Sequence, residues 1–217
     1  MFRTGGEAIR PGRPHSRPQY MSNTRILFGL GNPGERYQST RHNVGFMVLD
    51  HLAGRRNVRW SHAAAEYACA RIVLARMPLL LVKPLTFMNL SGDALRAVGA
   101  EEPVSAGKLL VVCDDFNLPL GSLRLRRSGS DGGHNGLSSL IQELGTEAFA
   151  RLRIGIGPAP RDRDPADFVL EPFGEEEMTV MRKTVRNAVR CVETWLEAGI
   201  DLAMSRFNTR IEPTESD

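Results

Sequence analysis

The chain has 217 residues, of which 28 are Lys or Arg and 25 are Asp or Glu, giving a formal net charge of +3. With 41% hydrophobic and 24% charged residues, its composition excludes a collagen-like repeat and an intrinsically disordered body. No apolar run approaches the ~18 residues that a membrane-spanning helix needs. We therefore expect a soluble, cytoplasmic protein that does not contact a membrane.

The charge is unevenly distributed along the chain. Residues 1–20 carry four Arg against one Glu, whereas residues 21–160 have a net charge of +5 and residues 161–217 a net charge of −5. A basic stretch therefore precedes an acidic one. Such a polarised distribution is more informative about an anionic partner than the overall net charge is.

One folded domain is predicted, with an extension at each end. Residues 1–22 contain three Pro, three Gly and four Arg without a periodic apolar pattern, which predicts a disordered arm. Residues 23–210 are predicted to form the folded domain, and residues 211–217 a C-terminal tail. The three cysteines are odd in number and far apart, which is typical of reduced thiols in a cytosol.

The first half of the domain is predicted to contain strands around one helix. Arg25–Gly31 is a short apolar run that ends in glycines, as expected for a buried strand followed by a tight turn. Val44–Leu52 has apolar residues at helical spacing, and Gly54 ends that helix. The apolar runs Tyr67–Leu74 and Leu79–Val82 surround a proline-containing turn and predict a hairpin.

The middle of the chain begins with a polar loop, Lys83–Ser91, that leads into a short predicted helix, Gly92–Val98. Leu109–Asp114 is nearly all aliphatic and ends in an acid, which is the pattern of a central strand. Leu123–Arg127 alternates apolar and basic residues, which predicts a strand with one solvated face. The glycine-rich loop Ser128–Gly136 follows it.

The last third of the chain is predicted to be mainly helical. Leu137–Leu144 is a helix closed by Gly145, Arg151–Gly157 is a strand, and Glu175–Ala198 is a long helix. Asp201–Phe207 forms a final short helix. Strands and helices interleave, but the hairpins break strict alternation, so we predict a single α/β domain with a mixed central β-sheet sandwiched by helices.

The run Gly29–Gly34 satisfies G-x-G-x-x-G directly after a predicted strand, which is the fingerprint of dinucleotide-binding folds. Its surroundings disagree with that interpretation. No amphipathic helix follows in Glu35–Asn43, and the acid expected about 20 residues further on falls inside a helical pattern, at Asp50. We therefore expect no dinucleotide cofactor. Asn32 nevertheless places an amide at the carboxyl end of a strand, where ligands bind in α/β sheets.

The candidate general base is His42, which precedes a predicted helix, because histidine is the side chain that titrates unaided near neutral pH. Asp114 and Asp115 end the predicted central strand. A carboxylate there can bind one ring nitrogen of a histidine, so that the other nitrogen accepts a proton from water. The alternatives are a structural histidine and acids that only form a turn. His62 and His134 are ambiguous.

Two further loops, Thr86–Gly92 and Gly132–Gly136, hold asparagines beside glycines or helix starts. Asn89 and Asn135 can grip a peptide backbone or a carbonyl oxygen on which negative charge develops, although helix N-caps are the commoner role. No serine or cysteine nucleophile motif and no zinc-ligand spacing is present. The sequence therefore predicts attack by water without a metal.

Five arginines lie on the two predicted strands that flank the glycine-rich loop: Arg124, Arg126, Arg127, Arg151 and Arg153. The guanidinium group suits bidentate contact with phosphate. Few aromatic residues are nearby, so a backbone or terminal phosphate is a better candidate ligand than a stacked base. For any one of these arginines the alternative is a solvated sheet face.

Taken together, five segments resemble the bacterial-type peptidyl-tRNA hydrolase family: GLGNPGERYQSTRHNVGF (29–46), KPLTFMNLSG (83–92), VVCDDFNLPLG (111–121), GGHNGLSSLIQELG (132–145) and RLRIGIG (151–157). The resemblance extends from Arg25 to Phe207. It implies a monomeric α/β enzyme without metal or other cofactor. Such an enzyme hydrolyses the ester between a peptide and the tRNA 3′ end and so recycles prematurely released peptidyl-tRNA. The implied contacts are with the tRNA acceptor stem and 3′ end and with the C-terminal part of the peptide.

The resemblance also implies roles for individual residues. His42 matches the catalytic base, and Asp114 matches the carboxylate that orients it. Arg126 and Arg153 fall where the family holds basic residues that clamp the tRNA 5′-phosphate. The residues implied to bind or line the path of the substrate are Asn32, Tyr37, Asn89 and Asn135. The chain departs from frequent family residues at Cys113, Asn117 and Asp131. The alternative, an RNA-binding relative without activity, would not need the base and its acid.

Overall fold

A computed structural model of the chain describes residues 23–64 and 66–208. The predicted arm, residues 1–22, and the predicted tail, residues 211–217, lie outside the described residues. Both therefore stay predictions. Among the described residues, none of the helices combines the length and the apolar character needed to cross a membrane.

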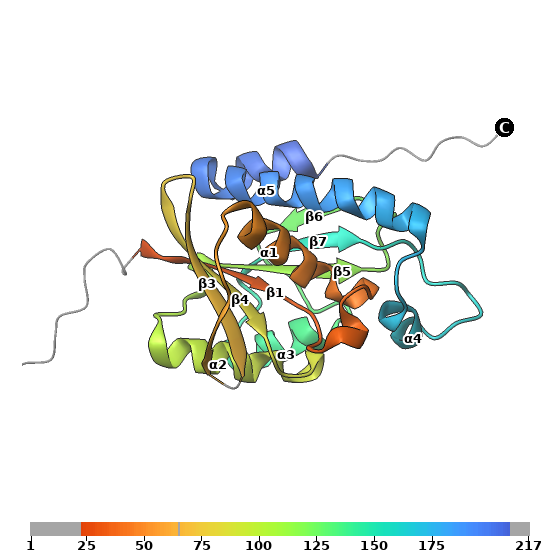
Figure 1. The fold of residues 1–217 in the computed structure, drawn as a ribbon, viewed down its shortest axis with the longest axis horizontal. Helices are drawn as coiled ribbons and strands as arrows, with labels where there is room; N and C mark the ends of the chain where they lie inside the picture. Colours follow the sequence, from red (N-terminus) through yellow and green to blue (C-terminus); the bar gives the residue numbers. More distant parts are fainter. Residues whose placement is uncertain (1–22, 65, 209–217) are drawn as a thin grey trace, which may run out of the picture.

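A seven-stranded mixed sheet forms the centre of the domain, in the order β2-β3-β4-β1-β5-β7-β6 (Figure 1). β1 pairs in parallel with β4 and with β5, and β5 pairs in parallel with β7, whereas β2, β3 and β6 are added antiparallel. The carboxyl ends of β4, β1, β5 and β7 therefore meet at one edge of the sheet. The strands are β1 (Arg25–Gly29), β2 (Ser61–Ala64), β3 (Tyr67–Leu74), β4 (Met77–Pro84), β5 (Leu109–Asp115), β6 (Leu123–Arg126) and β7 (Ala150–Gly155).

Helices cover both faces of the sheet, which confirms the predicted sandwich (Figure 1). One face packs against α1 (Val44–Arg55) and α5 (Glu175–Phe207), and the other against α2 (Ser91–Glu101) and α3 (Asn135–Leu144). The central strands feed both layers by alternation, since Leu27 joins the α1–α5 core while its neighbours on β1 join the α2–α3 core. Burial on both faces explains why these strands read as continuous apolar runs.

The structure adds elements that the sequence pattern did not predict. β2 is a short edge strand, and α4 (Pro165–Leu170) lies within the segment between β7 and α5. The two helices predicted near the C-terminus form one element, α5, kinked at Gly199, whose φ of 82° is left-handed. The remaining short elements are the 3₁₀ turns η2 (Glu35–Tyr37), η3 (Arg41–Asn43), η4 (Met88–Leu90) and η5 (Ala106–Lys108).

Two features bring the segment after β1 close to the end of β5. Only 3₁₀ turns follow the glycine run before α1 begins, so no helix N-terminus points at the glycines as in a dinucleotide site. At Gly45, in the first turn of α1, an added Cβ would lie 2.6 Å from both the backbone nitrogen of Leu30 and the backbone oxygen of Val112. Glycine therefore permits the close approach that places the preceding turn, η3, over the end of β5.

Candidate active site

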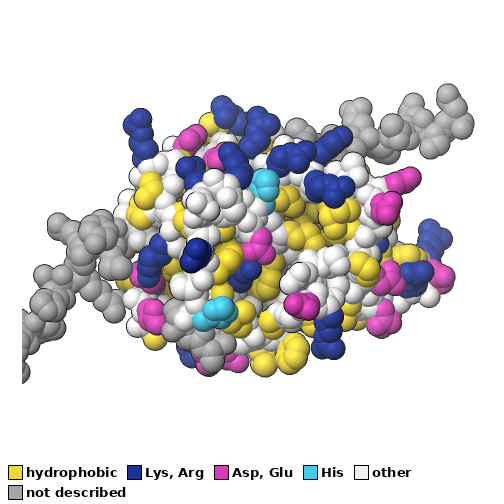
Figure 2. Space-filling view, in the orientation of Figure 1, with side chains coloured by type: hydrophobic (Ala, Val, Ile, Leu, Met, Phe, Trp, Pro, Cys, Tyr) yellow, Lys and Arg dark blue, Asp and Glu magenta, His cyan; other side chains and the backbone are white. Residues whose placement is uncertain are grey.

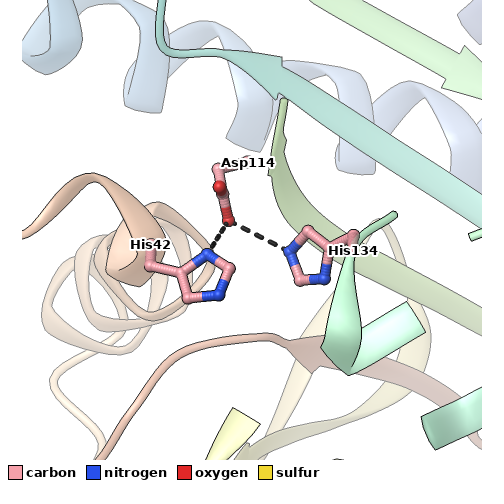
Figure 3. A group of neighbouring side chains, drawn as sticks. All are labelled: His42, Asp114 and His134. Carbon is pink, nitrogen blue, oxygen red and sulfur yellow. Dashed lines mark hydrogen bonds and ion pairs between the residues drawn. The ribbon is translucent and has the colours of Figure 1, made fainter. Parts of the chain in front are cut away.

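The predicted base and its carboxylate meet at the carboxyl edge of the sheet. His42 lies in η3 and Asp114 near the end of β5, and Nδ1 of His42 is 2.8 Å from Oδ1 of Asp114 (Figure 3). Their side chains are only 11% and 2% exposed, respectively. A buried contact of this length is a strong, charge-assisted hydrogen bond.

A second imidazole contacts the same carboxylate oxygen. Nε2 of His134 lies 3.1 Å from Oδ1 of Asp114 (Figure 3). Nδ1 of His134 accepts hydrogen bonds from the backbone N–H groups of Gly136 and Leu137, so this histidine caps α3. A ring nitrogen that accepts carries no proton, so in the neutral ring Nε2 holds the proton and donates it to Asp114. The sequence alone leaves this role open; its only signal was a histidine in the glycine-rich loop, three residues before the predicted helix Leu137–Leu144.

The charge of Asp114 determines which tautomer a neutral His42 adopts. Burial by itself would raise the pKa of Asp114, but the imidazoles of His42 and His134 outweigh it and hold that pKa well below its usual range. Asp114 is therefore an anion at neutral pH and accepts an Nδ1–H from His42. In the neutral ring, Nε2 of His42 is then the nitrogen without a proton, which is the acceptor that a general base needs.

His42, Asp114 and His134 also form a group whose ligand atoms lie within 4.8 Å of one another, close enough to hold a metal ion. Nδ1 of His134, however, already accepts two backbone amides. Metal binding at its Nε2 would then leave the ring without a proton on either nitrogen, an imidazolate that neutral conditions disfavour. The donor set thus suits a hydrogen-bonded relay better than a metal centre.

Asn32 is held rigidly beside the base. Its backbone N–H donates to Oδ1 of Asn43 (2.8 Å), and Nδ2 of Asn43 donates to the carbonyl of Asn32 (2.9 Å). Oδ1 of Asn32 accepts the backbone N–H of Met88 (2.9 Å). Within the described residues, Nδ2 of Asn32 has no hydrogen-bond partner, so it is the donor left for a substrate. Asn43 was not among the predicted site residues, and its only signal in the sequence is its place directly after His42.

The other predicted substrate residues lie around this centre at different depths. Asn135 begins α3 beside His134, and Asn89 lies in η4, which packs against α3; both are exposed. Tyr37 is half-buried in η2, and the guanidinium of Arg36 lies 4.6 Å from its ring centroid. Tyr37 does not line the cavity beside the histidines. The structure therefore places Asn135 in the lining of the cavity that His42 also lines, and keeps Tyr37 outside that lining.

A cavity of about 270 Å³ opens beside the two imidazoles. The end of β5, the glycine-rich loop and α4 enclose it, so the helix that the sequence pattern missed is a wall of the site. Asp164 is the N-cap residue of α4, because its side chain accepts the backbone N–H of Ala166 (2.9 Å). The lining includes His42, Asp114, His134, Asn135, Arg153 and Val169.

Buried Arg41 ties the turn that carries the base to the segment that carries α4. Its guanidinium donates to both carboxylate oxygens of Glu177 (2.8 and 3.1 Å) and to the carbonyl oxygens of Glu171 and Pro172. The ring of Phe168 in α4 lies 4.3 Å below the guanidinium carbon. These contacts fix the position of η3 relative to the cavity wall.

The five arginines expected near phosphate have different surroundings. The register of β6 and β7 pairs Arg124 with Arg153 and Arg126 with Arg151, so these four share one face of the sheet. Arg151 is buried and donates to the carbonyl oxygens of the loop that follows β6 and of the turn before β7. Its role is to shape the glycine-rich loop, so the expectation of phosphate contact is wrong for this arginine.

The remaining arginines differ in their partners. Arg153 is half-buried, lines the cavity and contacts Oδ2 of Asp115 at 2.5 Å. Arg127 contacts Asp201. Arg126 is exposed, and no ion-pair partner for it exists in the described ranges. Arg126 and Arg153 therefore lie diagonally across β6 and β7, with their Cα atoms roughly 7–8 Å apart by the geometry of an antiparallel pair.

Comparison with known proteins settles the family. Residues 26–215 match the family model of peptidyl-tRNA hydrolase. The chain belongs to the peptidyl-tRNA hydrolase family. The resemblance drawn from five segments of the sequence is thereby confirmed.

Individual family members match most of the chain. The peptidyl-tRNA hydrolase of Fervidobacterium nodosum is 44% identical over 184 residues, which are 85% of this chain and 96% of that relative. The one from Thermotoga sp. (strain RQ2) is 46% identical over 184 residues, 85% of this chain and 97% of its own length. The crystal structure of peptidyl-tRNA hydrolase from Acinetobacter baumannii superposes with a TM-score of 0.80 at 29% identity, covering 87% of this chain and 96% of that one.

Proposed function

We propose that the chain hydrolyses the ester bond of peptidyl-tRNA, releasing free tRNA and a peptide, with His42 as the general base. The observation that carries this proposal is the buried 2.8 Å contact between Nδ1 of His42 and Oδ1 of Asp114, which leaves Nε2 of His42 free to accept a proton. Membership of the peptidyl-tRNA hydrolase family supports the choice of substrate. The enzyme acts as a monomer in the cytoplasm, where it recycles tRNA from prematurely released peptidyl-tRNA.

In the first step, Nε2 of His42 takes a proton from a water molecule while the water oxygen attacks the ester carbonyl. Asp114 stabilises the imidazolium that forms. The tetrahedral intermediate then collapses, and His42 returns the proton to the departing 3′-oxygen of the tRNA. General-base catalysis of this kind supplies about 10²–10⁴-fold. Burial raises the pKa of the neighbouring Cys113 thiol, as does the charge of Asp114, so this thiol stays protonated and water is the nucleophile.

The amides around the base stabilise and position the reacting group. Nδ2 of Asn32 is held in place by Asn43 and by the backbone of Met88, so it can donate without reorganisation. One donor aimed at a developing oxyanion contributes about 10²–10³-fold. Asn135, which lines the cavity, and the exposed Asn89 hold the peptidyl or 3′-terminal part of the substrate, and Tyr37 lines its approach.

The tRNA side of the substrate lies over β6 and β7. Arg126 has no competing acid among the described residues, and Asp115 holds the guanidinium of Arg153 in position at the cavity. Two guanidinium groups on one sheet face suit the 5′-phosphate at the end of an acceptor stem.

The proposed function is tested with N-acetylaminoacyl-tRNA, by measuring the release of free tRNA. The wild type should hydrolyse it, and His42→Asn should lose about 10²–10⁴-fold in kcat while retaining its affinity for tRNA, because only the proton acceptor is removed. Near-normal turnover by the variant would refute the assignment of the base. If the wild type binds the substrate but never releases tRNA, the chain is an RNA-binding relative without activity.

A further inference from the structure

The turn η3, which carries His42, is fastened along one side to the segment that follows α4. The backbone N–H of Arg41 donates to the carbonyl of Glu171 (3.0 Å), and the N–H of Phe173 donates to the carbonyl of Ser39 (3.2 Å). An isolated antiparallel bridge lies between these two hydrogen bonds. The backbone contacts fix where the turn lies, whereas the direction of each of its side chains depends on what that side chain meets.

The side chain of Arg41 adds a second, buried attachment to the same segment. Nη1 donates to the carbonyl oxygens of Glu171 and Pro172 (3.3 and 3.0 Å), and Nη2 donates to both carboxylate oxygens of Glu177 (3.1 and 2.8 Å). This side chain is only 8% exposed. Because the donors of a guanidinium lie in one fixed plane, contacts with a carboxylate and two carbonyls determine its orientation, which a lysine could not achieve.

A neighbouring carboxylate is placed less favourably for this role. The surface around α4 and the loop before it, at the right of Figure 2, carries acidic and basic side chains side by side. One such pair joins Arg163 to Glu171 (2.7 and 2.9 Å), with side chains 52% and 39% exposed. The Glu171 carboxylate also lies 3.6 Å from Arg41. Water and salt screen exposed ion pairs, so this carboxylate holds Arg41 less firmly than the bidentate contact of Glu177 does.

Arg41 directly precedes His42 within η3, and this order links the two side chains. Consecutive residues of a 3₁₀ turn point about 120° apart. Arg41 accordingly faces α4 and α5, while His42 faces Asp114. A rotation of the turn that releases Arg41 from Glu177 therefore turns the imidazole as well. The 2.8 Å contact with Asp114 and the direction of Nε2 would both change.

We propose that Arg41 and Glu177 act together as positioning residues for the catalytic base. This inference rests on the proposed function, which makes His42 that base. The pair keeps the imidazole and the α4 wall of the cavity at a fixed separation, and the ester is attacked in the space between them. Both residues act through His42 rather than on the substrate. A misplacement of about 1 Å at a reacting group can lower the rate about 10²-fold.

The test compares two variants of the pair with one control. Glu177→Gln removes the charge but keeps an oxygen that can accept the N–H of Gly174 at the start of α5, and Arg41→Lys keeps the charge but loses the planar fork. With N-acetylaminoacyl-tRNA, each should lower kcat about 10- to 100-fold and change KM less than about threefold. Glu171→Gln, the same chemical change beside the same guanidinium, should keep kcat within about twofold of the wild type because its carboxylate is exposed.

The double variant Arg41→Lys/Glu177→Gln tests whether the two residues act as one unit. Its kcat should be no lower than that of the weaker single variant, since either change already breaks the contact. Losses that multiply would overturn the pairing. Thermal unfolding shows which variants are folded at the assay temperature, and if Arg41→Lys is not folded, the comparison of Glu177→Gln with Glu171→Gln decides the proposal.

NMR of the free protein provides a readout that does not depend on turnover. The proton on Nδ1 of His42, which Asp114 accepts, is assigned by its absence from His42→Asn. It should exchange with water about tenfold faster in Glu177→Gln than in the wild type, and at the wild-type rate in Glu171→Gln.

Two results would overturn the positioning role: a folded Glu177→Gln with wild-type kcat, and a fall in kcat without faster exchange, because the imidazole would then not be displaced. Equal losses of kcat in Glu171→Gln and Glu177→Gln would overturn it as well. Faster exchange in Glu177→Gln, in a protein whose wild type releases no tRNA, would contradict the proposed function alone.

Discussion

Replacing Asp114 with Asn tests the relay in the most direct way, because it removes one charge and preserves the shape of the side chain. The carboxylate contacts Nδ1 of His42 at 2.8 Å, which places the charge centres of an imidazolium and a carboxylate about 4 Å apart. At an effective dielectric constant near 20 that separation corresponds to ~4 kcal/mol. If this attraction is present only when His42 is protonated, its loss lowers kcat about 10³-fold.

The assay is the pH dependence of kcat and of kcat/KM with N-acetylaminoacyl-tRNA. Asp114→Asn should lower kcat about 10³-fold across the pH range, with KM changing less than about threefold, since the interaction arises in the transition state. Asp115→Asn is the matched control: Asp115 follows Asp114 on β5 but contacts Arg153, so it should raise KM and spare kcat. A kcat for Asp114→Asn within tenfold of the wild type would refute the reasoning.

The same substitution has a predictable effect on stability. The pKa of Asp114 lies below its ordinary value of 3.8 in the folded chain. The carboxylate therefore stabilises the fold above about pH 4, and this contribution is lost as the pH falls through the folded-state pKa. Denaturant unfolding should show a less stable Asp114→Asn at pH 7 and a smaller difference from the wild type at pH 3. A difference that grows on acidification would contradict the direction of the shift.

Two further predictions concern the second imidazole, His134, and the arginine Arg126 on β6. His134→Asn keeps a side-chain acceptor for the N-terminus of α3 but loses the donor to Asp114, so kcat should fall about tenfold with little change in thermal stability, whereas His134→Ala should also lose about 1 kcal/mol of stability with the cap. Kinetics and thermal unfolding of the two variants measure this, and an Asn variant with wild-type kcat would show that the second imidazole plays no part. Arg126→Gln should raise KM about tenfold for a substrate with a 5′-phosphate, reduce the salt dependence of binding by about one phosphate contact, and spare a substrate without that phosphate. Arg124→Gln on the same sheet face is its control, and an equal effect of Arg126→Gln on both substrates would refute the phosphate contact.

The relay explains why the site uses a histidine that is itself a helix cap. Gly136 and Leu137 donate to His134, which fixes its tautomer and makes it a permanent donor to Asp114. The oxygen that orients His42 is thereby prevented from rotating away. Arg41 likewise positions the turn that carries His42, through its contacts with Glu177 and with Phe168 in α4.

Local pattern was sufficient for much of the fold. β5 is buried on both faces, so its sequence is a nearly continuous apolar run without alternating polar residues. The strand Leu109–Asp115 was therefore predicted to within one residue. The prediction missed β2, whose four residues form an edge where pairing with β3 rather than propensity decides the conformation. It also missed α4, although Asp164 followed by Pro165 was a readable start signal, because six residues are too short for a periodic pattern.

The sequence by itself determined the chemistry available to this protein: a histidine, a strand-end acid and several asparagines in segments that together identify the family. Only the tertiary structure decided which of these groups touch. Asp114 and His134 are 20 residues apart, and His42 is 72 residues from Asp114, yet both imidazoles contact the same oxygen of Asp114, Oδ1. The alternation on β7 likewise gives Arg151 and Arg153 the same local signal, and burial separates a loop-shaping residue from a candidate phosphate ligand. Periodicity reports the face on which a side chain lies, whereas the packing of distant segments determines what that side chain meets there.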